Sequence, residues 1–381
     1  AFSGRIGILA NPPSLYLDGN CLASEWWDLS MTTRVLMIGP SLDVKGGMTS
    51  VSKAILGANS SDIHIEFHPS MHDRSLIGRI SHWSARILTC PIRAVFRRPD
   101  VVHIHVSNRL SVWRKLSILL VWRMCFVPVV LHTHGSGAKD HLGGLRGIRR
   151  LVMRFGFRSA SRLVVLSESW ADFYSETCGL QRSKISILPN PVLIPEDNPT
   201  KQIGPLLVIY TGVIGERKGS FDLIRAWATI PETVRSSCRL KIAGNGQIEE
   251  ARNLAEGLGI SDTCEILGWI SDAERDGLLS RGSIYVLPSF NEGLPMGLLE
   301  AMANRMAVIT TPVGGIPELV EDGENGLLVE PGDASGISKA IESLASSEER
   351  RDSLANNAFA SVRGHGLDEY MKGLSEIWAK A

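Results

Sequence analysis

The chain has 381 residues, of which 44% are apolar and 21% charged, so it is long enough for two domains with sizeable cores. This balance excludes an intrinsically disordered chain. No run of about 18 uncharged apolar residues is present, which argues against a membrane-spanning helix. The six cysteines lie far apart without a Cys-x-x-Cys pair, which is typical of reduced cytosolic thiols rather than a disulfide framework or a zinc site.

The net charge of zero conceals two halves of opposite charge. Residues 31–205 hold 23 Lys and Arg against 11 Asp and Glu, a net charge of +12, whereas residues 206–381 hold 16 against 26, a net charge of −10. Within the basic half, residues 74–162 contain 17 basic residues and only two acidic ones, Asp100 and Asp140. Such a stretch is either a solvated surface or a binding surface for phosphates, an anionic membrane or nucleic acid.

The predicted elements begin after residue 31. Residues 1–30 lack the charged start and apolar run of a signal peptide, so we interpret them as a non-native or disordered extension. Beyond them, short apolar runs alternate with amphipathic segments of helical length. We expect strands at residues 34–39, 101–105, 129–131, 163–166, 206–210, 240–243, 265–267, 284–287, 307–310 and 326–329.

This alternation predicts an α/β protein with two doubly wound parallel sheets, because runs that are apolar on both faces suit strands covered by helices on each side. Residues 189–205 contain five prolines and indicate a linker. We therefore expect an N-terminal domain over residues 31–200, a C-terminal domain over residues 201–360 and a final helix within residues 361–381. Ligands of open α/β sheets bind beyond the carboxyl ends of the strands, so the crevice between the domains is the expected site.

Residues 110–126 form a mostly apolar segment that carries Arg114, Lys115 and Arg123. These charges make a bilayer-spanning helix unfavourable. The segment is either a buried helix or an interfacial one, and its basic surroundings favour attachment to an anionic membrane surface.

Two His-x-His pairs, His103/His105 and His132/His134, occur at predicted strands, where a spacing of two places each pair on one face. Imidazole is a common zinc ligand, but no carboxylate or cysteine accompanies either pair, so we expect no metal. His105 is interpreted as structural. His134 ends a strand just before Gly135 and is either structural or a ligand contact.

The strongest motif is PSFNEGLPMGLLEAM at residues 288–302. A helix should begin near Pro295, a residue tolerated at the first helical position, and its free N–H groups from about Met296 to Leu298 suit a phosphate. Glu292 and Glu300 would then accept hydrogen bonds from sugar hydroxyls. The alternative is an acid favoured by the helix dipole and a surface glutamate. The chain has neither an Asp-x-Asp metal motif nor a P-loop, and Gly244-Asn-Gly246 is only part of a dinucleotide fingerprint.

Glu292 and Glu300, separated by seven residues, resemble the paired-glutamate signature (E-x7-E) of glycosyltransferase family 4, which are retaining enzymes of the GT-B fold. Further segments resemble that family in the same order: GGMTSV at residues 46–51, HTHGS at 132–136, GERKG at 215–219, IAGNG at 242–246, LGWI at 267–270 and TPVGGIPELVEDGENGLLVEPGD at 311–333. The resemblance covers about residues 34–378. It implies two Rossmann-like domains facing a cleft, with the acceptor in the first, the nucleotide sugar in the second and the last helix crossing back to the first.

The resemblance implies a role for several side chains. Glu300 would hold the ribose of the nucleotide, Glu292 the donor sugar, and Lys218 would neutralise the leaving diphosphate, on which negative charge grows. His134 would contact the donor sugar or the acceptor. The catalytic candidates are therefore His134, Glu292 and Lys218.

Other residues complete the implied donor site. Gly46 and Gly47 would let the backbone approach the donor. Trp269 and Ile270 would flank the nucleobase, with packing in the core as the alternative for the tryptophan. Family members usually carry an arginine where this chain has Val213, so either Arg217 substitutes for it or the diphosphate is stabilised less strongly. The implied donor-binding set is Gly46, Gly47, Arg217, Lys218, Gly244, Trp269, Ile270, Glu292, Pro295, Met296, Gly297, Leu298 and Glu300.

The implied activity is that of a retaining glycosyltransferase. It would move a sugar from a nucleotide-diphosphate sugar to a glycan or lipid-linked acceptor in cell-surface polysaccharide or glycolipid synthesis, with no metal or other cofactor. We expect a cytoplasmic protein at the inner face of the plasma membrane, and no nucleic-acid partner, because aromatic residues do not interleave the basic stretch. The alternatives are another GT-B enzyme, such as a sugar-nucleotide epimerase, or a non-catalytic sugar-nucleotide binder.

Overall fold

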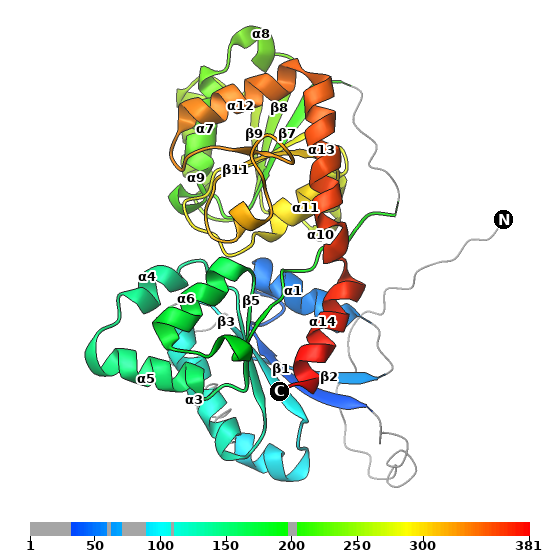
Figure 1. The fold of residues 1–381 in the computed structure, drawn as a ribbon. Helices are drawn as coiled ribbons and strands as arrows, with labels where there is room; N and C mark the ends of the chain where they lie inside the picture. The colour runs from blue at the N-terminus through cyan, green and yellow to red at the C-terminus, as the bar shows by residue number, and fades with distance from the viewer. Residues whose placement is uncertain (1–31, 59–61, 71–88, 108–109, 197–203) are drawn as a thin grey trace, which may run out of the picture.

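The computed structural model describes residues 32–58, 62–70, 89–107, 110–196 and 204–381. The expected extension at residues 1–30 and the linker residues 197–203 lie outside this part of the chain. Two six-stranded parallel sheets, each covered by helices, form two lobes, and the last helix descends from the second lobe onto the first (Figure 1).

The first sheet has the strand order β2-β1-β3-β4-β5-β6. Its strands are β1 (Thr33–Gly39), β2 (Ile63–Pro69), β3 (Val101–Val106), β4 (Val129–Thr133), β5 (Arg162–Val165) and β6 (Ile185–Ile187). The helices of this lobe include α1 (Gly47–Gly57), α3 (Leu110–Met124), α4 (Ala138–Gly143), α5 (Gly147–Arg158) and α6 (Glu168–Cys178).

The second sheet has the order β12-β11-β10-β7-β8-β9. Its strands are β7 (Leu206–Thr211), β8 (Cys238–Ala243), β9 (Cys264–Gly268), β10 (Ile284–Leu287), β11 (Ala307–Thr310) and β12 (Leu327–Leu328). Its helices are α7 (Ser220–Thr229), α8 (Glu232–Arg235), α9 (Ile248–Gly257), α10 (Asp272–Leu279), α11 (Met296–Ala303), α12 (Ala334–Ser346) and α13 (Glu348–Val362), and α14 (Leu367–Ala379) ends the chain.

Every strand expected from the sequence is present, which confirms the doubly wound α/β architecture. The sequence missed β2 and β6, the two edge strands of the first sheet. β2 carries histidine and glutamate among its apolar residues and is only partly buried, and β6 has three residues, so neither shows the continuous apolar run of a central strand.

Helix α3 is buried, which decides between the two interpretations of residues 110–126. Val112, Leu119 and Trp122 are almost fully inaccessible and belong to the core under the first sheet. The interfacial interpretation of this helix was therefore wrong, and only its end, at Met124 and Phe126, is exposed. No helix in the described ranges is both long enough and apolar enough to cross a bilayer.

Helix α14 belongs to the core of the first lobe although it follows the second in sequence (Figure 1). It packs on β1 and α1 through Tyr370, Leu374, Ile377 and Trp378. The indole Nε1–H of Trp378 also donates a hydrogen bond of 3.0 Å to His103 Nδ1 inside the first sheet. The last helix therefore ties the two lobes together.

Leu374→Ala should destabilise the first lobe, because Leu374 is fully buried between α14 and the sheet. Truncating such a leucine costs about 2–5 kcal/mol of unfolding free energy. Urea denaturation would measure it, with Lys372→Ala on the exposed side of the same helix as the control. Equal stability of the two variants would show that α14 is not docked.

Candidate functional site

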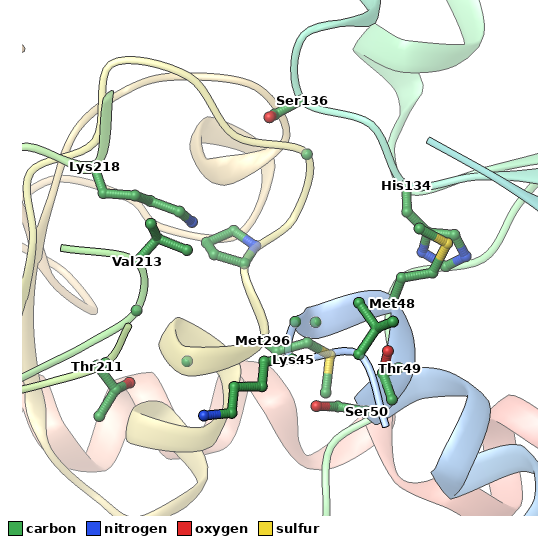
Figure 2. A pocket seen from close by; sticks show the side chains of 18 of the residues that line it. Lys45, Met48, Thr49, Ser50, His134, Ser136, Thr211, Val213, Lys218 and Met296 are labelled. Carbon is green, nitrogen blue, oxygen red and sulfur yellow. The ribbon is translucent and has the colours of Figure 1, made fainter. Parts of the chain in front are cut away.

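A cavity of about 950 Å³ lies between the two lobes, where the carboxyl ends of both sheets meet (Figure 2). Lys218 and Val213 lie on one side of it and His134 on the other. Of the residues predicted for the site, the cavity lining includes His134, Gly46, Gly47, Arg217, Lys218, Gly244, Trp269, Ile270, Glu292, Pro295, Met296, Gly297 and Glu300. Leu298 is the exception: its side chain is fully buried in the core, so only its backbone can serve the site.

Two helices direct their amino ends at this cavity, one from each lobe. Gly46 precedes α1 and Pro295 precedes α11, and neither helix has a side-chain cap. The first N–H groups of a helix have no partner within it, and the helix dipole adds positive potential there. Gly47 faces Met296 closely, since a Cβ on Gly47 would lie 3.4 Å from Met296 Cγ. Together the two ends form an anion-binding surface.

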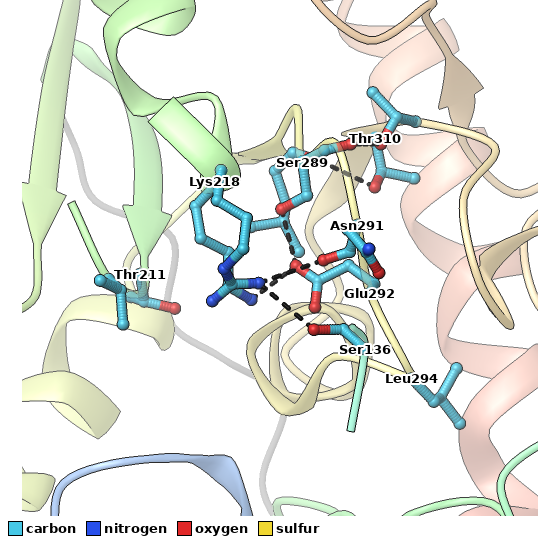
Figure 3. A network of polar contacts seen from close by, with 12 residues as sticks. Ser136, Thr211, Lys218, Ser289, Asn291, Glu292, Leu294 and Thr310 are labelled. Atoms are coloured by element: carbon cyan, nitrogen blue, oxygen red, sulfur yellow. Dashed lines mark hydrogen bonds and ion pairs between the residues drawn. The ribbon is translucent and has the colours of Figure 1, made fainter. Parts of the chain in front are cut away.

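Lys218 and Glu292 form a buried ion pair at the wall of the second lobe (Figure 3). Lys218 Nζ donates to Glu292 Oε1 at 2.5 Å, and Ser289 Oγ donates to the same oxygen at 2.6 Å. The two side chains are 16% and 5% exposed. Gly219 fixes this arrangement: it has φ of 68°, and a Cβ there would lie 2.0 Å from the carbonyl oxygen of Pro288. Only glycine therefore lets the lysine loop approach the loop before α11 this closely.

Arg217 reaches across the cleft from the same loop. Its Nη1 donates to the carbonyl of Asn291 at 3.2 Å and lies 3.5 Å from Ser136 Oγ of the first lobe. Asn291 Nδ2 in turn donates to Asp140 at 3.3 Å. Val213 lines the cavity near Lys218 without bringing a charge, so Arg217 is the second cation of this loop at the site.

Glu300 lies inside the cavity beside Arg275, a residue that the sequence analysis missed. Arg275 Nε is 3.7 Å from Glu300 Oε2, and Arg275 also contacts Asp272 and Asp276. Burial raises the pKa of Glu300 to about 7, although the charge of Arg275 opposes that rise. Glu300 therefore titrates near neutral pH.

Trp269 is not a core residue. Its side chain is 48% exposed, and Lys45 Nζ of the first lobe lies 4.3 Å from the centroid of its ring. The core-packing alternative for this tryptophan was wrong, whereas Ile270 packs partly against the core. An open aromatic face at the cavity wall can stack on a planar ligand group.

The two His-x-His pairs form one cluster, because β3 pairs with β4 in parallel and places His105 beside His132. His103 Nε2 lies 3.2 Å from His132 Nδ1, and His105 Nδ1 lies 2.8 Å from His134 Nε2. Burial lowers the pKa of His103 and of His134 to about 3, and it also lowers the pKa of His105 and of His132 well below the usual range. All four imidazoles are therefore neutral at physiological pH.

The ring nitrogens of His103, His105 and His132 all lie within 4.8 Å of one another, a grouping able to hold a metal ion. Both nitrogens of His103 are, however, engaged, one with Trp378 and one with His132. A metal would have to break that chain of hydrogen bonds. The absence of a metal remains a prediction.

Two polar residues on the side of the first lobe also belong to the site, and neither was predicted from the sequence. Lys115 is buried on α3 and donates from Nζ to the carbonyl of His105, and burial lowers its pKa to about 7. Asn190, in the segment that leaves the first lobe, donates to the carbonyl of Leu294 at 2.8 Å. Both line the cavity. The prolines around Asn190 indicated a linker, but nothing in that pattern indicated a contact with the loop before α11.

Two family models match the chain, one for each lobe. Residues 72–191 match a Glycosyl transferase 4-like domain, and residues 196–361 match Glycosyl transferases group 1. Among curated proteins, the α-D-kanosaminyltransferase of Streptomyces kanamyceticus is 33% identical over 40% of this chain and 39% of its own length. The lipopolysaccharide core biosynthesis glycosyltransferase LpsE of Rhizobium meliloti is 32% identical over 42% of this chain and 45% of its own length. The chain thus spans less than half the length of these two relatives.

A solved structure extends the comparison to the whole fold. The crystal structure of Anabaena Alr3699/HepE in complex with UDP and glucose has a TM-score of 0.71, 17% identity, and coverage of 92% of this chain and 100% of that one. At that identity the likeness concerns the fold alone. Each lobe therefore resembles a glycosyltransferase domain in sequence, and the two facing sheets have the two-lobe α/β architecture of the GT-B fold.

Proposed function

We propose that the protein transfers a sugar from a nucleotide-diphosphate sugar to an acceptor, with retention of the anomeric configuration. The observation that carries this proposal is the meeting of two uncapped helix N-termini, Lys218, Arg217 and Glu300 in one cavity between the lobes. A diphosphate needs backbone donors and cations, and its ribose needs a hydrogen-bond acceptor. The relatives that carry glycosyltransferase names and the neighbour solved with UDP and glucose support it.

The C-terminal lobe would hold the donor. Its diphosphate would lie at the amino end of α11, where Lys218 and Arg217 balance its charge, and Glu300 would accept hydrogen bonds from the ribose hydroxyls. Trp269 and Ile270 would flank the base. Two cations and two helix ends supply the positive potential that a metal ion supplies elsewhere, so we propose that no metal is needed.

The rate of the transfer step would depend on how well the site stabilises the negative charge that develops on the leaving diphosphate. The bond from the anomeric carbon to the phosphate oxygen breaks and a bond to the acceptor oxygen forms on the same face. The acceptor's proton passes to the departing phosphate oxygen, so no enzymic base is required. His134, neutral because burial lowers its pKa to about 3, would hydrogen-bond a sugar or acceptor hydroxyl. Glu292, held by Lys218 and Ser289, would face the donor sugar.

The acceptor would be a glycan or a lipid-linked sugar in polysaccharide or glycolipid synthesis, bound by the N-terminal lobe. The name of LpsE supports this class. The excess of basic residues over residues 74–162 supports work at an anionic membrane surface on the cytoplasmic side.

The configuration of the product tests the proposed reaction. A panel of uridine, guanosine and adenosine diphosphate sugars should identify the donor by thermal shift, since ligand at about 100 times its Kd adds about 2.7 kcal/mol. NMR of the product, or of the free sugar released at early times, should show the α anomer from an α-linked donor. The opposite anomer would exclude retention, and an epimerised nucleotide sugar would make the protein an epimerase.

Affinity for the donor should fall as the pH falls through 7. The pKa of Glu300 is raised to about 7, so the carboxylate that accepts from the ribose is present above this pH and is lost below it. Binding of the nucleotide sugar, whose diphosphate diester keeps its charge over this range, should be about tenfold weaker at pH 6 than at pH 8 by calorimetry. Glu300→Gln should abolish the loss of affinity at low pH. Lys115, which is kept in the variant and also has a pKa of about 7, gains a positive charge as the pH falls and therefore cannot weaken the binding of an anionic donor. The same slope in the variant would place Glu300 outside the ribose site.

Lys218→Met should lower kcat by about 10²–10³-fold, because the leaving diphosphate loses its closest cation. The substitution also leaves the buried Glu292 carboxylate without its cation, so the melting temperature of the variant is compared with that of the wild type to separate an effect on catalysis from an effect on stability. Arg225→Met, on the exposed face of α7, is the control. Normal turnover in the single variant would exclude Lys218 from leaving-group stabilisation.

A further inference from the structure

Helix α5 presents an apolar face to solvent. Its exposed apolar side chains follow the spacing of one helical face, and they are Ile148 (73% exposed), Leu151 (64%), Val152 (49%) and Phe155 (63%). Residues three and four apart on a helix are neighbours. The outward side of α5 is therefore a continuous apolar stripe, whereas a surface helix normally turns such a stripe inward.

The opposite side of α5 anchors the helix to the lobe. Its buried residues are Met153, Gly156 and Phe157. Gly156 allows close packing on α3, because a Cβ there would lie 2.8 Å from Leu116 Cδ1, and the ring of Phe157 lies 5.4 Å from that of Tyr174 on α6. The lobe therefore fixes which side of α5 faces outward, on the flank of the first lobe (Figure 1).

Arginines border the apolar stripe. Arg146, Arg149, Arg150 and Arg158 are exposed, and the helix contains no acidic residue. An apolar stripe with arginines beside it is the pattern of a helix that lies in a membrane interface, where the arginines meet lipid phosphates. We propose that α5 docks the protein on a bilayer surface rich in anionic phospholipid.

The charge of α5 also argues against a second copy of the chain as the occupant. If two copies met through this face, the arginines of one copy would face the arginines of the other and repel them. The area of one helix face is also small compared with the about 800 Å² that each partner buries in a stable interface. Anionic lipid headgroups neutralise the same arginines. The inference does not depend on the proposed transfer reaction, and its test measures no transfer.

The position of α5 suits delivery of a lipid-linked acceptor. His134 and Ser136 line the cavity, α4 follows at Ala138, and α5 begins at Gly147, so a short stretch of chain joins the docking helix to the cavity wall. Docking through α5 would place the acceptor side of the cleft near the bilayer.

Co-sedimentation of the full chain with vesicles tests this inference. The wild type should pellet at low salt with phosphatidylglycerol/phosphatidylcholine vesicles and not with phosphatidylcholine alone. Arg149→Ser/Arg150→Ser should weaken binding about 30-fold, since each arginine near an anionic surface contributes a factor of about five. Leu151→Ser/Phe155→Ser should weaken vesicle binding at least about tenfold, because it removes apolar area from the stripe. This weakening should persist at salt concentrations that screen charge.

Matched variants control for net charge and for exposed apolar area. Lys339→Ser/Lys372→Ser removes two exposed cations from other helices, and Leu193→Ser/Leu258→Ser removes two exposed apolar side chains away from α5; both should pellet like the wild type. Melting temperatures of all variants should match. The proposal fails if the wild type does not pellet, if the α5 variants pellet undiminished, or if size exclusion shows a dimer that Leu151→Ser/Phe155→Ser dissociates.

Discussion

The rest of the site is arranged around the backbone N–H groups at the start of two helices, which have no partner within their own helix. Parallel sheets with helical crossovers bring helix starts to the carboxyl ends of their strands. Because the two lobes face each other at those ends, α1 and α11 direct their positive ends at one cavity. Neither helix has a side-chain cap, so its first N–H groups are open to an anionic ligand. The surrounding residues refine a preference for anions that the backbone already creates.

The charges around this cavity are arranged in pairs with different properties. Lys218 and Glu292 neutralise each other in a nearly dry wall, where either charge alone would be costly. Arg275 and Glu300 are farther apart, and the pKa of Glu300 rises to about 7 despite the arginine. Across the cleft, burial lowers the pKa of His103 and His134 to about 3, so these imidazoles add no positive charge to the cavity.

Much of this arrangement was predictable because the relevant signals are local. Central strands are apolar on both faces, and the loop before α11 combines glycine, proline and acids within a few residues. What the sequence missed depends on tertiary contacts. The parallel pairing of β3 with β4 joins two histidine pairs that lie 29 residues apart, and Arg275 reaches Glu300 from another helix. The face of α5 was missed because its spacing is that of an ordinary helix that buries its apolar side.

The hydrogen bond from Trp378 to His103 has a consequence for biosynthesis. Domains generally fold in order of their emergence from the ribosome. Here the first sheet obtains part of its core from α14, which is translated after the second sheet. Ribosome-bound nascent chains therefore carry an N-terminal lobe with an exposed apolar surface until α14 has emerged, and removal of α14 acts on the first domain rather than the second.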